Sequence, residues 1–284
     1  MQDNRYIVNS LSVETNHLGV SELLRFYIEA NKLSYSTITL DLTECIHIDA
    51  NLSALILAIS HKLQLKNKVR VFVEFNKSQN IFFRNGLVSH LQGKGNNNQY
   101  GDSRESTIPL KIFNPDEDES FCSYLSNDFF SHRSLINVPL ATKQSLRSHY
   151  LEIFNNVWLH ANTSLPIFSC GQFFPEKNIL KFTLIDIGDG FLKKINVNTN
   201  GRIDNDKSAI IWATEGLNTT KDVSTFGPGG TGLKLLKKYC LENNGSLHIS
   251  SGSGYVNMLN GRTLEYNLPC IFQGSIINII MRNI

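Results

Sequence analysis

The sequence lacks the features that mark disulfide-rich, zinc-binding or membrane-spanning proteins. Its five cysteines are odd in number, scattered, and never spaced as CxxC, which argues against a disulfide framework and a zinc site. The longest apolar run, near residues 52–59, is far shorter than the ~20 residues that cross a bilayer. Residues 1–10 lack the charged and then apolar profile of a signal peptide. We therefore expect a soluble cytoplasmic protein with reduced thiols.

Charge of one sign is also lacking. The chain has 27 basic and 25 acidic side chains, a net charge of +2, and no long block of either sign. This balance argues against a dedicated surface for nucleic acid or for an anionic membrane. The 284 residues leave room for two modest α/β domains, each with its own core.

Residues 1–92 alternate element types and form the first predicted domain. Residues 37–42 and 69–74 are rich in β-branched side chains and predict strands. Residues 52–63 carry leucine and isoleucine at helical spacing between these strands, and 21–30 predict another amphipathic helix. Strand, helix and strand in this order indicate a right-handed crossover and a parallel pair.

Residues 93–118 predict a linker or long loop, because 92–106 are rich in Gly, Asn and Ser and lack apolar periodicity. Residues 119–284 form the second predicted domain, an α/β sandwich. The elements expected there are helices at 145–162 and 230–243 and strands at 166–174, 179–187, 246–251, 262–268 and 274–282. Between them, 191–226 are polar and irregular, which is typical of a functional lid or a disordered loop.

The first candidate site segment lies on the helix at 145–162. Glu152, Asn156 and His160 are spaced four apart and share one helix face. An amide oxygen together with phosphate oxygens can hold Mg²⁺, and a carboxylate one turn away can accept a proton from an attacking water. An exposed polar stripe on an amphipathic helix explains the same spacing.

The second segment is Asp186-x-Gly188-x-Gly190, at the end of an apolar strand. A buried aspartate there can accept the exocyclic amine of adenine, and the glycines let the backbone approach the base and leave the strand sharply. A plain strand-to-loop turn is the alternative.

The third segment is a glycine-rich loop that opens the helix at 230–243. Successive glycine amides at a helix N-terminus form an anion cradle, although a flexible hinge explains the same composition. The loop residues that we expect to contact a ligand are Gly227, Gly229, Gly230, Thr231, Gly232 and Leu233.

Taken together and in this order, these segments resemble those of the GHKL (Bergerat-fold) ATPases, and residues 140–284 carry the resemblance. The form Glu152-x-x-x-Asn156-x-x-x-His160-Ala is most similar to anti-sigma-factor kinases and to one subgroup of histidine kinases. The resemblance implies ATP and Mg²⁺ as ligands, with Mg²⁺ on Asn156, a base at Glu152, adenine on Asp186 and phosphates on the 229–233 amides. It also makes 191–226 an ATP lid, in which Thr219, Thr220 and Lys221 either approach the phosphates or are ordinary surface.

The first domain resembles, less specifically, the STAS domains of anti-sigma-factor antagonists. Residues 40–49 are similar to the central strand and turn of that family, and 52–63 to its following helix. The family places a phosphoacceptor serine directly after the aspartate, whereas this chain reads Asp49-Ala50-Asn51. Ser53 lies too far along to take that role. We therefore expect a scaffold or homodimerisation role rather than a phospho-switch.

The leading functional hypothesis is a bacterial-type regulatory protein that binds Mg·ATP or Mg·ADP. Slow hydrolysis or phosphoryl transfer would gate its contacts with an unidentified protein partner. Two alternatives stay open: an anti-sigma-type serine/threonine kinase that acts on a STAS-like partner, and a non-enzymatic ATP-dependent interaction switch in a multi-protein system.

Overall fold

The computed structural model describes residues 4–76, 79–94, 102–114, 116–161, 165–215 and 231–282, with the side chains of 157–161 excepted. The chain forms a mixed α/β structure with one larger antiparallel sheet and two smaller parallel ones. Within these described ranges, no helix combines the length and apolar character that crossing a membrane requires.

The N-terminal region has a parallel sheet in the order β1-β3-β5 and a small parallel pair, β2-β4. Helix α2 lies between β3 and β5 in the chain, so the predicted strand–helix–strand order and parallel pair are confirmed. The elements of this region are β1 (Asn4–Ile7), β2 (Ser12–Val13), α1 (His17–Ala30), β3 (Thr37–Leu42), β4 (His47–Ile48), α2 (Ser53–Asn67), β5 (Arg70–Phe75), α3 (Ile81–Arg84) and α4 (Leu87–Leu91).

The C-terminal region has a five-stranded antiparallel sheet in the order β6-β7-β8-β10-β9. The expected helix at 145–162 and the hairpin at 166–187 are confirmed as α6, β7 and β8. The elements are β6 (Thr107–Phe113), α5 (Asp118–Tyr124), α6 (Leu140–Ala161), β7 (Ile167–Phe174), β8 (Ile179–Asp186), α7 (Leu192–Asn198), α8 (Asp206–Ala213), α10 (Gly232–Glu242), β9 (Ser246–Leu259) and β10 (Arg262–Arg282).

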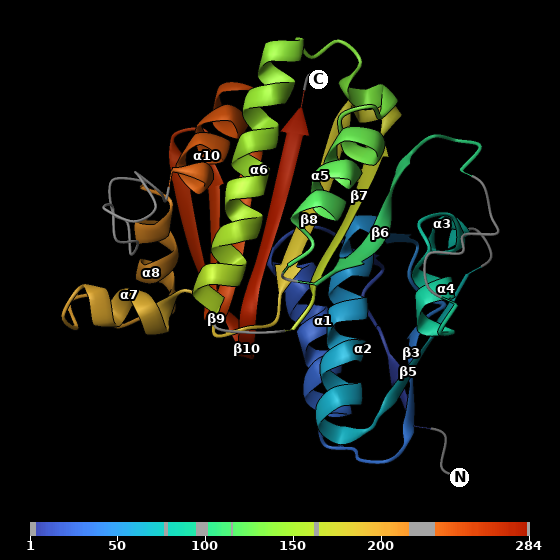
Figure 1. The fold of residues 1–284 in the computed structure, drawn as a ribbon. Coiled ribbons are helices and arrows are strands. Elements are labelled where there is room, and N and C mark those ends of the chain that lie inside the picture. The colour runs from blue at the N-terminus through green and yellow to red at the C-terminus, as the bar shows by residue number, and fades with distance from the viewer. Residues whose placement is uncertain are drawn as a thin grey trace.

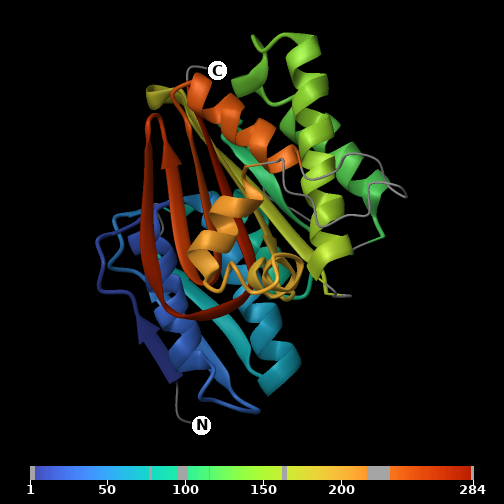
Figure 2. The ribbon, with the colours of Figure 1, turned by 90° about the vertical axis from the view of Figure 1, so that its left-hand side faces the viewer.

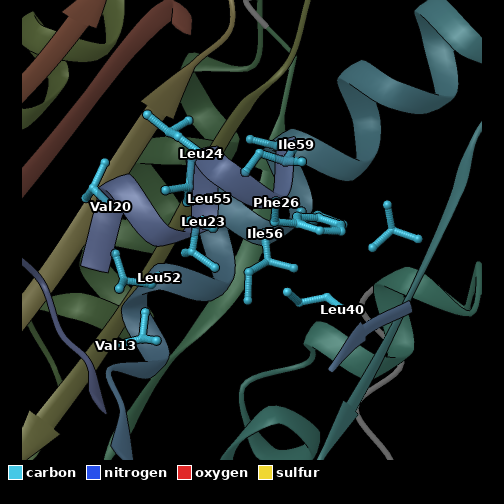
Figure 3. Packing of buried hydrophobic residues seen from close by; sticks show 14 of the residues in the cluster. Val13, Val20, Leu23, Leu24, Phe26, Leu40, Leu52, Leu55, Ile56 and Ile59 are labelled. Carbon is cyan, nitrogen blue, oxygen red and sulfur yellow. The ribbon is translucent and has the colours of Figure 1, made fainter. Parts of the chain in front are cut away.

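Both faces of the five-stranded sheet are covered (Figure 1). Helices α5, α6 and α10 cover one face. Helices α1 and α2 cover the other and lie between this sheet and the N-terminal one. Figure 3 shows the labelled side chains of α1 and α2, among them Leu23 and Leu55, which belong to a cluster that also contains Phe168 of β7 and Ile276 of β10. The two regions therefore share one hydrophobic cluster, and a second cluster lies under α5, α6 and α10.

Three expectations about the elements were wrong. The range 93–118 is not only a linker, because β6 lies in it and pairs with β7. The range 191–226 is not irregular throughout, because it contains α7 and α8. The three short strands expected after residue 245 are two long ones, β9 and β10, which Figure 2 shows beside α8 and α10. Breaks in register between Asn267 and Ser275 of β10 account for the apparent third strand.

Candidate functional site

Strand β8 carries side chains alternately to the two covered faces of the sheet. Phe182 and Leu184 pack in the cluster with α6 and α10, whereas Ile185 packs in the cluster with α1 and α2. Thr183 also faces the N-terminal region, since its hydroxyl accepts a hydrogen bond from Asn51 at 2.7 Å. The alternation puts Asp186, at the end of the strand, on the face covered by α6 and α10.

The Asp186 carboxylate is buried, with 3% of the residue exposed. Oδ1 accepts the backbone N–H of Gly188 at 2.9 Å, and Oδ2 accepts the N–H of Ser275 at 3.0 Å and its hydroxyl. Burial raises the pKa of Asp186, while these hydrogen bonds and the charge of Lys62 oppose the rise. A carboxylate offers about four acceptor positions, so these three bonds leave room for one more donor.

Two glycines allow the backbone to pass close to Asp186. Gly190 has φ +74°, and a Cβ there would overlap the Ser251 hydroxyl. Gly274 on β10 has φ +123°, and a Cβ there would overlap the Asp186 carbonyl oxygen. The Ser251 hydroxyl donates to the Gly274 carbonyl at 3.1 Å and accepts the N–H of Phe191 at 3.0 Å. The turn after β8 is thus fixed against β9 and β10, and the positive φ of Gly190 agrees with the sharp exit expected there.

The first and third sequence segments meet where α6 faces the start of α10. Glu152 accepts the backbone N–H of Thr231 at 2.9 Å through Oε1 and its hydroxyl at 3.2 Å through Oε2. A Cβ on Gly232 would lie 3.1 Å from both Glu152 Oε2 and the His149 carbonyl oxygen, so the two helices approach closely there. A carboxylate at a helix N-terminus is also electrostatically favourable.

Asn156, one turn after Glu152, carries a buried Oδ1 that has no hydrogen-bond partner in the described part of the chain. Asn155 Oδ1 has the same property. A buried acceptor without a partner costs about 1–3 kcal/mol, which favours a position that a ligand or ion fills. The described residues contain no group of three or more His, Cys, Asp or Glu side chains that could hold a metal.

Several expected site residues fall outside the described ranges. They are Thr219, Thr220, Lys221, Gly227, Gly229 and Gly230, and the side chain of His160 joins them. Leu233 is described, and its side chain is buried in the cluster under α10. Of the expected lid, α8 is docked on the sheet: Asp206 accepts the N–H and hydroxyl of Ser253 of β9 at 2.7 and 2.8 Å.

A cavity of about 370 Å³ lies between α6 and α10. Its lining includes Ser145, His149, Leu235 and Tyr239 but none of the three segments' functional side chains. Ser145 and His149 are within hydrogen-bond distance of each other, at 3.2 Å. This cavity borders α6 one turn before Glu152.

Sequence reasoning missed Ser275, which donates to Asp186, Ser251, which fixes the turn beside it, and Lys62, whose charge acts on it. They come from β10, β9 and α2, and only strand pairing and the packing of α2 on the sheet bring them together. Glu152, Thr231 and Gly232 are in contact, and Asp186 lies on the same side of the sheet. Neither a scan against protein-family models nor a search of curated proteins finds a match to this chain.

Proposed function

We propose that the C-terminal region is a GHKL-type Mg·ATP-binding domain, joined to a STAS-like N-terminal region in a regulatory protein. The observation that carries the proposal is the contact of Glu152 with Thr231 and Gly232, on the side of the sheet where Asp186 is buried. A carboxylate of α6, a glycine at the start of α10 and a buried aspartate at the end of β8 thus lie on the same side of the five-stranded sheet.

The described residues fit such a ligand. Asp186 has an acceptor position left for the exocyclic amine of adenine. The unpartnered Oδ1 of Asn156 is the hard oxygen ligand that Mg²⁺ prefers. The N-terminus of α10 offers backbone N–H groups and a favourable dipole to phosphates. Gly232, where a Cβ would crowd Glu152, belongs to the same start of α10.

ATP would supply the phosphoryl group, and Glu152 would accept the proton of the attacking group. The same carboxylate bonds Thr231 and so also stabilises the start of α10. A base that first has to leave this contact is consistent with slow turnover. Three hypotheses stay open: a regulatory protein whose nucleotide gates a protein partner, a kinase, and a non-enzymatic switch. They are distinguished by whether the phosphate is hydrolysed, transferred or only bound.

The N-terminal region is best explained as a scaffold rather than as a phosphoacceptor. Asp49, Ala50 and Asn51, which occupy the turn where STAS domains carry the acceptor, are fully buried. Ala50 donates its N–H to Gln172 of β7 at 2.5 Å, and Ser53 is also fully buried. A kinase cannot reach any of these groups in this arrangement.

Calorimetric titration with Mg·ATP tests the binding proposal. Asp186→Ala should weaken binding at least 30-fold, because losing the acceptor leaves an amine unpaired at a cost of about 2 kcal/mol. Asp189→Ala is the matched control, since Asp189 is exposed and pairs only with Lys193 among the contacts described. Undiminished affinity in the Asp186 variant would refute the assignment of the adenine position.

Glu152→Gln tests the chemistry separately from binding. The glutamine oxygen can still accept the Thr231 N–H, so α10 keeps its partner while the base is lost. Turnover should fall by ~10²-fold or more with nearly unchanged nucleotide affinity. Labelled-phosphate transfer to candidate STAS-like proteins then separates kinase from hydrolase. Wild-type turnover in this variant would remove Glu152 from the mechanism and favour the switch.

A further inference from the structure

A bend in β10 connects the N-terminal region to the candidate adenine position. The pairing of β10 with β9 shifts register between Asn267 and Phe272 and again between Phe272 and Ser275. Gly274, inside this bend, has φ +123°. Ser275, the next residue, donates both its N–H and its hydroxyl to Asp186. The conformation of residues 272–275 therefore determines how the Asp186 carboxylate is held.

Lys62 of α2 holds this bend from the opposite face of the sheet. Its Nζ donates to the Gln273 carbonyl oxygen at 2.9 Å and lies 5.2 Å from the centre of the Phe272 ring, whose residue is fully buried. On the C-terminal side, the Ser251 hydroxyl donates to the Gly274 carbonyl at 3.1 Å. The bend is thus fixed by one N-terminal side chain and by two strands of the sheet.

The charged groups near Lys62 support the same arrangement. The charged groups that bear on Lys62 are Asp186 of β8, which attracts it, and Lys66 of α2, which repels it; Phe272 and Gln273 on β10 are uncharged. Burial lowers the pKa of Lys62 to about 8. The ammonium in turn favours the ionised form of Asp186, which is the form that accepts a hydrogen bond without donating one.

We propose that Lys62 is a positioning residue for the adenine pocket: from the N-terminal region, it fixes the β10 bend that orients Ser275 and Asp186. This inference rests on the proposed nucleotide site. Through Lys62, the N-terminal region affects nucleotide affinity without contacting the nucleotide.

The test compares Mg·ATP affinity by calorimetry in the full-length chain. Lys62→Met keeps most of the aliphatic side chain but removes the donor, and it should weaken binding about tenfold, as expected for the loss of one charge-assisted hydrogen bond. Lys62→Arg keeps a charged donor and should stay within about threefold of wild type. Lys66→Met, on an exposed position of the same helix, should not change affinity.

The pH profile separates positioning from a general effect on folding. Wild-type affinity should decline as pH rises through about 8, because Lys62 loses the positive charge that strengthens its hydrogen bond to the Gln273 carbonyl and attracts Asp186. Lys62→Arg should bind equally well at pH 7 and pH 9.5, since arginine stays charged. Far-UV circular dichroism confirms that each variant is folded.

The results of these titrations separate a failure of the Lys62 proposal from a failure of the proposed nucleotide site. If Asp186→Ala loses binding while Lys62→Met binds as wild type, or if wild type and Lys62→Arg share one pH profile, Lys62 is not a positioning residue and the nucleotide site stands. If wild type itself does not bind Mg·ATP at any pH, the proposed function fails instead.

Discussion

Lys181→Met should destabilise the whole chain, because Lys181 pairs with a buried carboxylate across the two regions. Its Nζ donates to Asp49 Oδ2 at 2.6 Å, and no part of the Asp49 side chain is exposed. Thr15 donates its N–H and hydroxyl to the same oxygen, and His47 bonds the other. Burial alone would raise the pKa of Asp49, but the His47 and Lys181 contacts lower it to about 2.

The size of the effect follows from what the substitution leaves behind. Removing one partner of a buried ion pair costs about 3–5 kcal/mol. Asp49 keeps Thr15 and His47 as partners, so we expect the lower end, about 3 kcal/mol. With a urea m-value of about 3 kcal/mol/M, the midpoint should fall by about 1 M. Lys177→Met is the control, because Lys177 is exposed in the turn of the same hairpin.

Urea unfolding followed by two probes measures the effect. Tryptophan fluorescence reports on the C-terminal region, since Trp158 and Trp212 both lie there, and far-UV circular dichroism reports on both regions. The shared hydrophobic cluster predicts one transition that moves equally for both probes. A loss in Lys181→Met no larger than in Lys177→Met, or two separated transitions, would refute the view that this ion pair joins one cooperative unit.

Three further predictions concern other side chains. Burial lowers the pKa of His248 to about 4, so the unfolded state binds more protons than the folded state between about pH 6.5 and 4. The free energy of unfolding should therefore fall by up to about 3 kcal/mol as pH drops through that window. His248→Gln should flatten this part of a profile of urea midpoint against pH. Asp206→Ala should lose the acceptor for Ser253 and speed hydrogen exchange in α8, whereas the exposed Asp204→Ala should not. Tyr150→Phe should leave thermal stability unchanged or higher by up to about 1 kcal/mol, because its buried hydroxyl has no partner in the described chain; a loss above 1 kcal/mol would contradict that account.

Helices and strands with a clear hydrophobic pattern could be predicted from the sequence, and those whose hydrophobic pattern is interrupted could not. The hairpin of β7 and β8 was predictable because both strands are apolar and a polar turn joins them. Strand β6 was missed because Pro109 interrupts it and a Gly- and Asn-rich stretch precedes it. The structure resolves this conflict by placing β6 at a sheet edge, where proline is tolerated, with a register shift between Ile108 and Lys111.

The candidate site could be predicted only in part, for a related reason. Glu152 and the start of α10 meet as their order suggested, because each is fixed by a long helix. The surroundings of Asp186 could not be predicted, since Ser275 and Lys62 are ordinary residues in sequence; sheet register brings Ser275 into contact with Asp186, and helix packing brings the charge of Lys62 near it. The docking of Asn51 on Thr183 was unpredictable too, because polar side chains seldom indicate a buried contact between regions.

The covering of the second sheet face by α1 and α2 means that the N-terminal region acts as a tethered ligand of the C-terminal one. A short connection keeps such a ligand at an effective concentration of about millimolar. Any protein that recognises this face competes with that internal occupant, so its affinity for the intact chain falls by about the ratio of this effective concentration to the Kd of the internal contact. Partners of the full-length protein should therefore select other surfaces.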